Sequence, residues 1–167
     1  STVFADITPI KNLTIHTQFG ADYSHSTAFM RSYPSYIIND GNGSAGRNSS
    51  DALTLSETTT VNYRWALNDD HSLNFLLGQE AVDYQSTGFQ LITRGQANDK
   101  LTNVTSGTRA SSWADSNDSY SYLSFFFRGE YNYKDLYYAE VATRTDASSR
   151  FGKDHRWGVF WSLGFMW

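Results

Sequence analysis

The sequence contains no cysteine and only two prolines among its 167 residues. The absence of cysteine excludes a disulfide scaffold, thiol catalysis and a cysteine-ligated zinc site. Charged residues make up 18% of the chain, below the usual quarter. The 13 Lys and Arg against 17 Asp and Glu leave a formal charge of −4. Because there is no basic excess, we expect no nucleic-acid partner.

No run of 18 apolar residues occurs, so no transmembrane helix is predicted. The mean hydropathy of −0.50 is typical of a soluble protein, but outer-membrane barrels share such averages because their lipid-facing residues alternate with polar ones. The chain starts without Met or a signal-peptide pattern and stops within a patterned apolar stretch. We therefore expect an interior piece of a longer protein, with a mature protein whose signal was removed as the alternative.

Aromatic residues form 16% of the chain, and many alternate with polar residues at period two, which predicts β-strands. The clearest stripe runs from Trp157 to Trp167. At about 3.3 Å per residue and a tilt of about 40°, it covers roughly 25 Å of the membrane normal, the height of the apolar band of an outer-membrane barrel. About seven strands are expected, near residues 3–8, 13–24, 53–67, 72–85, 120–133, 137–144 and 157–167.

The expected connections alternate in length. Tight turns are predicted at residues 9–12, 68–71 and 134–135, and longer loops at Ser26–Ala52, Gly88–Ser119 and Ser148–His155. In an up-and-down meander the short and long connections lie at opposite edges, as in outer-membrane barrels. The sequence therefore predicts an all-β antiparallel meander that forms part of a transmembrane barrel. The alternative is a soluble β-sandwich binding module, in which the aromatic face packs against a second sheet.

Charged side chains fall on the polar side of two neighbouring predicted strands. Arg128 and Glu130 lie on one strand, and Glu140 and Arg144 on the next. Opposite charges on adjacent strands can pair there, whereas each would cost a few kcal/mol, roughly, on a lipid-facing surface. We therefore expect structural ion pairs on the lumen side of the barrel.

Three segments resemble the SusC/RagA-type TonB-dependent outer-membrane transporters. They are residues 9–15 (PIKNLTI), residues 71–80 (HSLNFLLGQE), and residues 131–137 (YNYKDLY) followed by 144–153 (RTDASSRFGK). They stand in the family's order and continue to Phe160 in its spacing. Ala147, Thr145 and Trp161 depart from its usual Gly, Arg and Pro.

The resemblance implies that residues 1–167 are one segment of a 22-stranded barrel, with neither the plug, the TonB box nor a signal peptide in this stretch. It also implies an importer of glycans or peptides in the bacterial outer membrane. Its implied partners are a SusD-like surface lipoprotein that acts as a lid, the TonB complex, which pulls on the plug, and the outer-membrane lipid.

Candidate binding residues come from the predicted long loops, because function concentrates on loops held by a rigid scaffold. Exposed aromatic and arginine side chains there would suit sugar stacking or lid contacts. These are Phe29, Tyr33, Tyr36, Arg94, Arg109 and Trp113. Packing of the loops on one another is the alternative. Asp146 and Arg150 of the family motif are expected at the outer rim, where they would fasten the last long loop.

No catalytic chemistry, metal or cofactor is predicted. The four histidines have no pair at ligand spacing. Segments 40–43 and 115–118 are rich in oxygen ligands, but neither fits an EF-hand loop. A glycan-cleaving enzyme would need a carboxylate pair on the polar face at the separation that glycosidases use, and no clear pair is evident.

Overall fold

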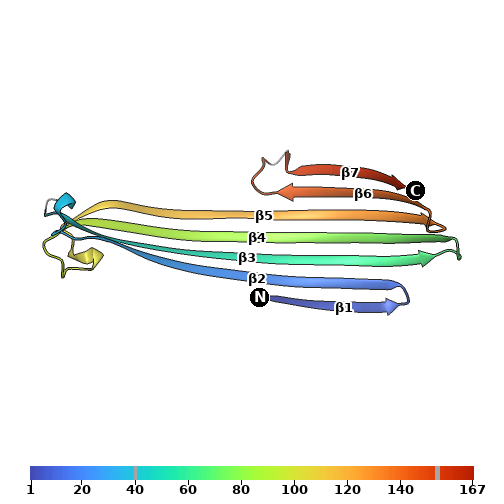
Figure 1. The fold of residues 1–167 in the computed structure, drawn as a ribbon, viewed down its shortest axis with the longest axis horizontal. Helices are drawn as coiled ribbons and strands as arrows, with labels where there is room; N and C mark the ends of the chain where they lie inside the picture. The colour runs from blue at the N-terminus through green and yellow to red at the C-terminus, as the bar shows by residue number, and fades with distance from the viewer. Residues whose placement is uncertain (40, 153–154) are drawn as a thin grey trace. The chain divides into compact units, whose positions relative to one another are not determined.

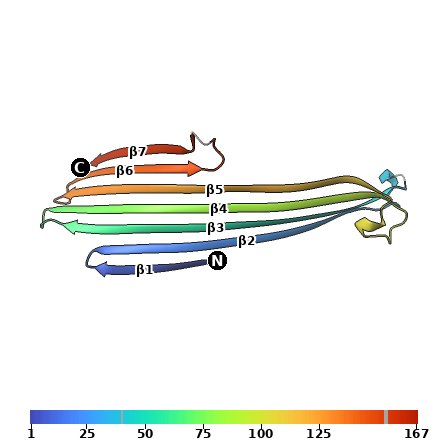
Figure 2. The same cartoon turned by 180° about the vertical axis from the view of Figure 1, so that it is seen from behind.

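The computed structural model describes residues 1–39, 41–152 and 155–167. Seven strands form one antiparallel sheet in the order β1-β2-β3-β4-β5-β6-β7, so each strand neighbours the next in sequence (Figure 1). Seen from behind, the order is the same (Figure 2). The strands are β1 (Thr2–Ile10), β2 (Leu13–Ser32), β3 (Gly43–Ala66), β4 (His71–Gln96), β5 (Arg109–Tyr133), β6 (Tyr137–Ser148) and β7 (Trp157–Met166). The predicted all-β meander of about seven strands is confirmed.

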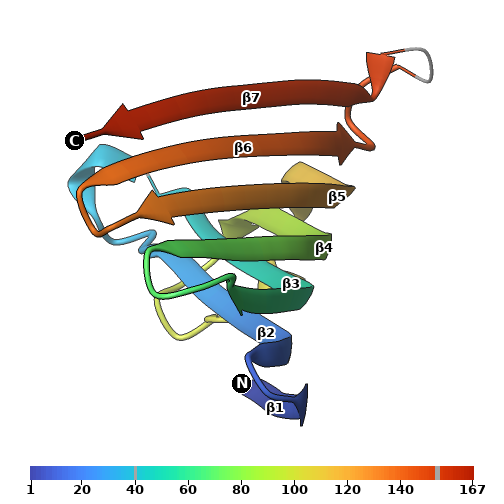
Figure 3. The same cartoon turned by 90° about the vertical axis from the view of Figure 1, so that its right-hand side faces the viewer.

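The chain divides into two compact units, and β2 to β5 contribute to both. The first unit comprises Ser1–Asp22, Thr54–Tyr84 and Tyr120–Trp167. The second comprises Tyr23–Leu53 and Gln85–Ser119. Figure 3 shows the strands following one another from β7 to β1, each turned relative to its neighbour as expected of a twisted sheet.

The first unit has one apolar and one polar face, as the alternation predicted. Across β5, β6 and β7 the register joins Phe127 to Thr143 and Thr143 to Trp161 on one side. One residue further along, it joins Arg128 to Ala142 and Ala142 to Ser162 on the other. We call the first side the apolar face; it includes Tyr131, Gly129, Phe125 and Leu123 of β5, Ala139, Val141, Thr145 and Ala147 of β6, and Phe165, Leu163, Val159 and Trp157 of β7.

Aromatic rings continue the apolar face onto the neighbouring strands. Phe75 of β4 stacks on Phe127 at 6.4 Å, and Phe125 stacks on Trp157 at 6.3 Å between ring centroids. Near the short turns, His71 lies 5.9 Å from Tyr131. The large side chains of this face are open to the surroundings, with Leu163 60% exposed and Phe165 77% exposed. The hydrophobic side chains therefore point out of the sheet rather than into a core.

Short turns join the strands at one end of the sheet, and two of them, at Asn12 and at Lys134 and Asp135, use left-handed backbone. Lys134 and Asp135 both have a φ of 55°, which the primed hairpin turn requires at its two central positions. The amide of Lys134 donates to the carbonyl of Asp70 at 2.7 Å, and the amide of Arg64 donates to the carbonyl of Asn12 at 2.9 Å. Each turn is thus hydrogen-bonded to the neighbouring hairpin.

In the second unit, the predicted long loops are wrong in their boundaries. Most of Ser26–Ala52 and Gly88–Ser119 belongs to strands, and the connections shrink to residues 33–42 and 97–108. They carry the short 3-10 helices η1 (Ile37–Asn39) and η2 (Val104–Ser106). The third predicted loop, Ser148–His155, agrees with the strand ends, because β6 ends at Ser148 and β7 begins at Trp157. The ladders continue because backbone hydrogen bonds sustain a strand even where its side chains are polar on both faces.

All seven strands belong to a single sheet, whereas a β-sandwich requires two packed sheets. The structure therefore supports the meander and not the sandwich alternative. Among the described residues, no helix is long and apolar enough to cross a membrane.

Candidate functional site

The polar face of the first unit is organised around Arg144 of β6. Its guanidinium donates to Glu80 on β4 at 3.0 Å, to Asp146 on its own strand at 2.6 Å, and to the hydroxyl of Ser124 at 3.0 Å. Arg144 reaches β4 across β5 because the buried Ser124 leaves room for it. One cation therefore holds three strands together on this face.

On the same polar face, the ring of Phe126 lies directly over Gly78. The ring of Phe126 lies so close that a Cβ on Gly78 would sit 2.1 Å from its Cζ. The guanidinium carbon of Arg144 lies 5.6 Å from the centroid of the same ring, within cation–π range. Gly78, Phe126 and Arg144 thus form one layered contact, and the absence of a side chain at Gly78 is what admits the ring.

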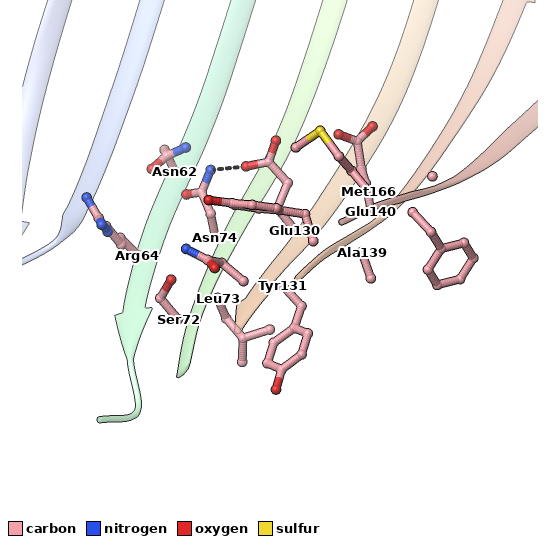
Figure 4. Close-up of a pocket in the computed structure, with 14 residues that line it drawn as sticks. Asn62, Arg64, Ser72, Leu73, Asn74, Glu130, Tyr131, Ala139, Glu140 and Met166 are labelled. Atoms are coloured by element: carbon pink, nitrogen blue, oxygen red, sulfur yellow. Dashed lines mark hydrogen bonds between the residues drawn. The ribbon is translucent and has the colours of Figure 1, made fainter. Parts of the chain in front are cut away.

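A hollow of about 770 Å³ lies on the polar face nearer the short turns (Figure 4). Figure 4 shows Asn62 and Arg64 projecting from β3, with Asn74 hydrogen-bonded to Glu130. That bond is 2.9 Å long, and Arg128 lies 3.2 Å from the other oxygen of Glu130. Glu140 stands directly opposite Glu130 in the register of β5 and β6.

Two carboxylates facing each other repel one another. Glu140 is exposed and Glu130 half-buried, so solvent reaches both. Glycosidase chemistry requires one carboxyl to be kept protonated by an apolar surrounding. The open polar hollow does not supply that environment. It can instead accept hydrogen bonds and attract cationic groups.

Placement of the four predicted charges on the polar face is correct, but their pairing differs from the prediction. Arg128 pairs with Glu130 on its own strand, and Arg144 pairs with Glu80 and Asp146. Among the described residues, Glu140 makes no ion pair. The residue directly opposite Arg144 on β5 is Phe126, which has no charge. Arg144 therefore pairs with Asp146, two residues further along its own strand.

In the second unit, a carboxylate links β2 to β3. The Tyr23 hydroxyl donates to Asp51, and Nδ1 of His25 lies 2.8 Å from the same oxygen. The hydrogen bond from Tyr23, followed by that from His25, lowers the pKa of Asp51 below its usual value. The same contact raises the pKa of Tyr23, because the neighbouring carboxylate disfavours the phenolate.

A second carboxylate orders the connections of this unit. Asp99 accepts from the hydroxyl of Ser35 at 2.5 Å and from its amide at 3.1 Å, and these bonds lower its pKa. Arg31 donates to the carbonyl of Asp99 and lies 4.3 Å over the ring of Tyr33. Arg31 and Asp99 therefore tie the β2–β3 connection to the β4–β5 connection.

Four of the six predicted loop residues lie on strands instead. Phe29 is on β2, Arg94 on β4, and Arg109 and Trp113 on β5; only Tyr33 and Tyr36 lie in a connection. Phe29 and Trp113 are 73% and 71% exposed. The alternative, that these loops pack on one another, agrees with Tyr33, whose ring is covered by the guanidinium of Arg31. It does not agree with the exposed rings of Phe29 and Trp113.

Among the described residues, no hydrogen bond, ion pair or ring contact joins these six side chains into one site. Phe29 instead lies beneath Arg47, whose guanidinium carbon is 5.3 Å from the ring centroid. The backbone of Arg94 accepts a hydrogen bond from the amide of Thr108, next to Arg109. The sequence analysis did not single out Arg47, which lies over Phe29, or Asp99, which binds Ser35. Each of them is distant in sequence from its partner.

The two rim residues of the motif have different surroundings. Asp146 lies within β6 and binds Arg144. Arg150 lies in the connection after β6, and its guanidinium carbon is 4.4 Å from the ring centroid of Tyr120. The amide of Ser121 donates to the hydroxyl of Ser149 at 2.8 Å. Arg150 and Ser149 therefore dock this connection onto β5.

Neither oxygen-rich segment forms a metal site in the part of the chain that the structure describes. Residues 115–118 are part of β5 rather than a loop. Asp40, at the start of segment 40–43, lies outside the described residues. Among the described residues, no group of three or more His, Cys, Asp or Glu is placed to hold a metal ion.

Comparison with known proteins gives relatives of one kind. The chain is 27% identical over 158 residues to the TonB-dependent receptor SusC of Bacteroides thetaiotaomicron, covering 95% of this chain and 15% of that protein. It is 24% identical over 174 residues to the TonB-dependent receptor P26 of Formosa agariphila, covering 98% of this chain and 17% of the relative. The chain thus spans less than a fifth of these relatives. No family model matches it.

Solved structures agree with the sequence relatives. The RagAB peptide transporter superposes with a TM-score of 0.92 at 30% identity over 98% of this chain and 19% of that chain. The siderophore receptor PiuA of Acinetobacter baumannii superposes with a TM-score of 0.54 at 9% identity, a likeness of fold alone. The predicted resemblance to SusC/RagA-type TonB-dependent transporters is confirmed, and it extends over nearly the whole chain.

Proposed function

We propose that this chain, which is similar throughout to SusC/RagA-type TonB-dependent transporters, is a wall segment of a 22-stranded outer-membrane barrel. Residues 1–167 would contribute seven strands of that wall. The observation that carries the proposal is the division of one antiparallel sheet into an apolar face of exposed rings and a polar face of charged side chains. Lipid outside and water inside a barrel require that division.

Two free edges accompany this sheet, at β1 and at β7. Unpaired N–H and C=O groups are not tolerated in hydrocarbon, and closure with further strands removes them. We infer that the rest of the transporter supplies those strands and the plug that the TonB complex pulls. In this proposal the chain is structural and has no enzymatic role, because the facing carboxylates Glu130 and Glu140 lie in an open polar hollow.

For the cargo we propose glycans or peptides, with a SusD-like surface lipoprotein as the lid. Exposed aromatic and arginine side chains in the second unit suit such contacts: Phe29, Tyr33, Tyr36, Arg94, Arg109 and Trp113. Phe29 and Trp113 are the strongest of these, because most of each ring is uncovered. Aromatic faces stack on sugar rings and on peptide side chains alike.

The experiment that tests the proposal is fractionation of the source bacterium with an antibody against residues 97–108. A heat-modifiable band in the outer membrane, far larger than the 18.9 kDa of this chain, is the expected result. A soluble band near 18.9 kDa would refute it. Uptake of labelled oligosaccharides and oligopeptides by Trp113→Ala and Phe29→Ala cells then tests the binding residues, with Leu136→Ala in a short turn as the control.

A further inference from the structure

The edge of β5 is open in the second unit, where β6 no longer accompanies it. The register of β5 with β6 ends at Tyr122, which lies opposite Ser148. One further contact follows, in which the amide of Ser149 donates to the carbonyl of Ser121 at 3.0 Å. Beyond it, no backbone hydrogen bond from β6 reaches residues 109–119 in the part of the chain that the structure describes. These residues are exposed throughout.

The direction of the backbone groups at this edge follows from Ser121. Its amide donates to the hydroxyl of Ser149 at 2.8 Å and its carbonyl accepts from the amide of Ser149, so both groups point towards the β6 side. Ser121 is bound to Asp83 of β4 and Ser116 to Gly88, so both strands advance by the same number of residues and no bulge lies between these contacts. In an antiparallel strand every second residue turns both groups to the same side. The residues that present theirs at the open edge are Trp113, Asp115, Asn117 and Ser119.

The edge lacks the usual protection against strand addition. Native proteins block long edges with proline, with lysine or with a bulge. Residues 109–119 contain neither proline nor lysine, and most of their side chains are small. At about 3.3 Å per residue the edge is roughly 36 Å long, which is enough for a peptide of about eight to ten residues.

Two side chains flank the edge on one face of β5. Trp113 and Asp115 are two residues apart on the strand and therefore project from the same face. Most of the Trp113 ring is uncovered, and Asp115 makes no ion pair among the described residues. An added strand with an apolar side chain opposite the ring and a basic one opposite the carboxylate would complement both.

From this arrangement we propose that β5 binds an extended peptide by strand addition beside residues 109–119. Peptide N–H groups donate to the carbonyls of the edge, and the edge amides donate to peptide carbonyls, at a repeat of about 6.7 Å. A glycan has no row of backbone amides at this repeat, so the edge selects peptides over glycans as cargo. The inference rests on the proposed importer only for naming the peptide as cargo.

The test measures peptide binding to the full-length transporter in detergent by fluorescence anisotropy. The probe is a labelled octapeptide of alternating lysine and valine. N-methylation of its two central amides removes an N–H from each side of the extended peptide, and we expect it to weaken binding about tenfold or more. The matched control carries the same two methyl groups on its last two amides and should retain most of the affinity. This comparison leaves the protein unchanged, so misfolding cannot explain its result.

Variants of Asn117 test the location of the peptide. Asn117→Pro removes an N–H that points to the open edge and keeps the ladder to β4, because an edge strand tolerates proline where its N–H faces outwards. We expect it to weaken binding by about fivefold or more. Asn117→Ala keeps that N–H and should bind the probe as the wild type does.

Failure of the wild type to bind the probe overturns the inference, as does equal affinity of the two methylated peptides or of the two Asn117 variants. Displacement of the probe by maltoheptaose also overturns it, because a neutral glycan cannot replace a strand. Outer-membrane insertion of each protein is checked by its heat-modifiable band. Failure of the barrel proposal is thereby recognised separately from failure of peptide binding.

Discussion

Substitution of Gly78 by Ala is expected to destabilise the barrel wall, because Phe126 occupies the space of the missing side chain. A Cβ at Gly78 would lie 2.1, 2.3 and 2.8 Å from three atoms of that ring. No such distances occur between real Cβ atoms and their neighbours, so the ring or the strand has to move. The ring also supports Arg144, which holds β4, β5 and β6 together. Overpacking costs about 1–3 kcal/mol, and because the atoms met are at the tip of a half-buried ring that can rotate away, we expect the lower part of that range.

The measurement is urea unfolding of the full-length transporter in detergent, followed by the loss of its heat-modifiable band. Gly164→Ala is the matched control, since Gly164 also lies on the polar face and a Cβ there would meet the nearest atom, Cβ of Glu140, at an ordinary 3.8 Å. Phe126→Leu in the Gly78→Ala background should restore most of the lost stability, because the smaller side chain vacates the space. A Gly78→Ala protein as stable as Gly164→Ala would refute the reasoning.

Three further predictions follow from the two faces and from the second unit. Leu163→Arg on the apolar face should cost about 2–4 kcal/mol of insertion free energy, whereas Ser162→Arg on the polar face should cost much less; the amount of each protein in outer-membrane fractions decides this. A double-mutant cycle of Arg144→Ala and Glu80→Gln should give a coupling of about 0.5–1 kcal/mol, because both side chains are partly exposed; additivity of the two unfolding free energies would contradict the pairing. The lowered pKa of Asp51 means that its contribution is complete above the unfolded-state value near 4 and is lost as the pH falls through the lowered value; amide exchange at residues 23–51 should therefore quicken in acid in wild type and not in Asp51→Asn.

The alternation of side chains predicted the faces of the first unit correctly. The sequence predicts Arg128 and Glu130 on the polar side of one strand and the aromatic stripe from Trp157 on the apolar side of another, and the register agrees. This signal is strong because lipid and water impose opposite demands on the two sides of each strand.

The predicted strands are too short in the second unit, where the side chains on both faces are polar. Residues 109–119 are exposed throughout, yet they belong to β5. Polar residues on both sides leave no period to detect, while backbone hydrogen bonds extend the ladder without regard to side chains. The candidate binding residues were predicted in loops because their segments show no alternation. A strand that is solvated on both faces lacks alternation as well.

Side-chain partners were the least predictable feature. The pairing of Arg144 with Glu80 spans two strands and depends on the small Ser124 between them.

The hydrogen bonds between short turns and neighbouring hairpins have a practical consequence for engineering this wall. The amide of Lys134 is bound to Asp70, and the amide of Arg64 to Asn12, so each hairpin is aligned with the next through its turn. An epitope inserted at residues 134–136 would displace two hairpins together. Residues 97–108 join β4 and β5 at the opposite ends of the strands. Asp99 there is bound to Ser35 of the β2–β3 connection, so a tag inserted after it, at residues 100–103, would leave that link in place. That connection is the natural place for a label that reports on the assembled transporter in living cells.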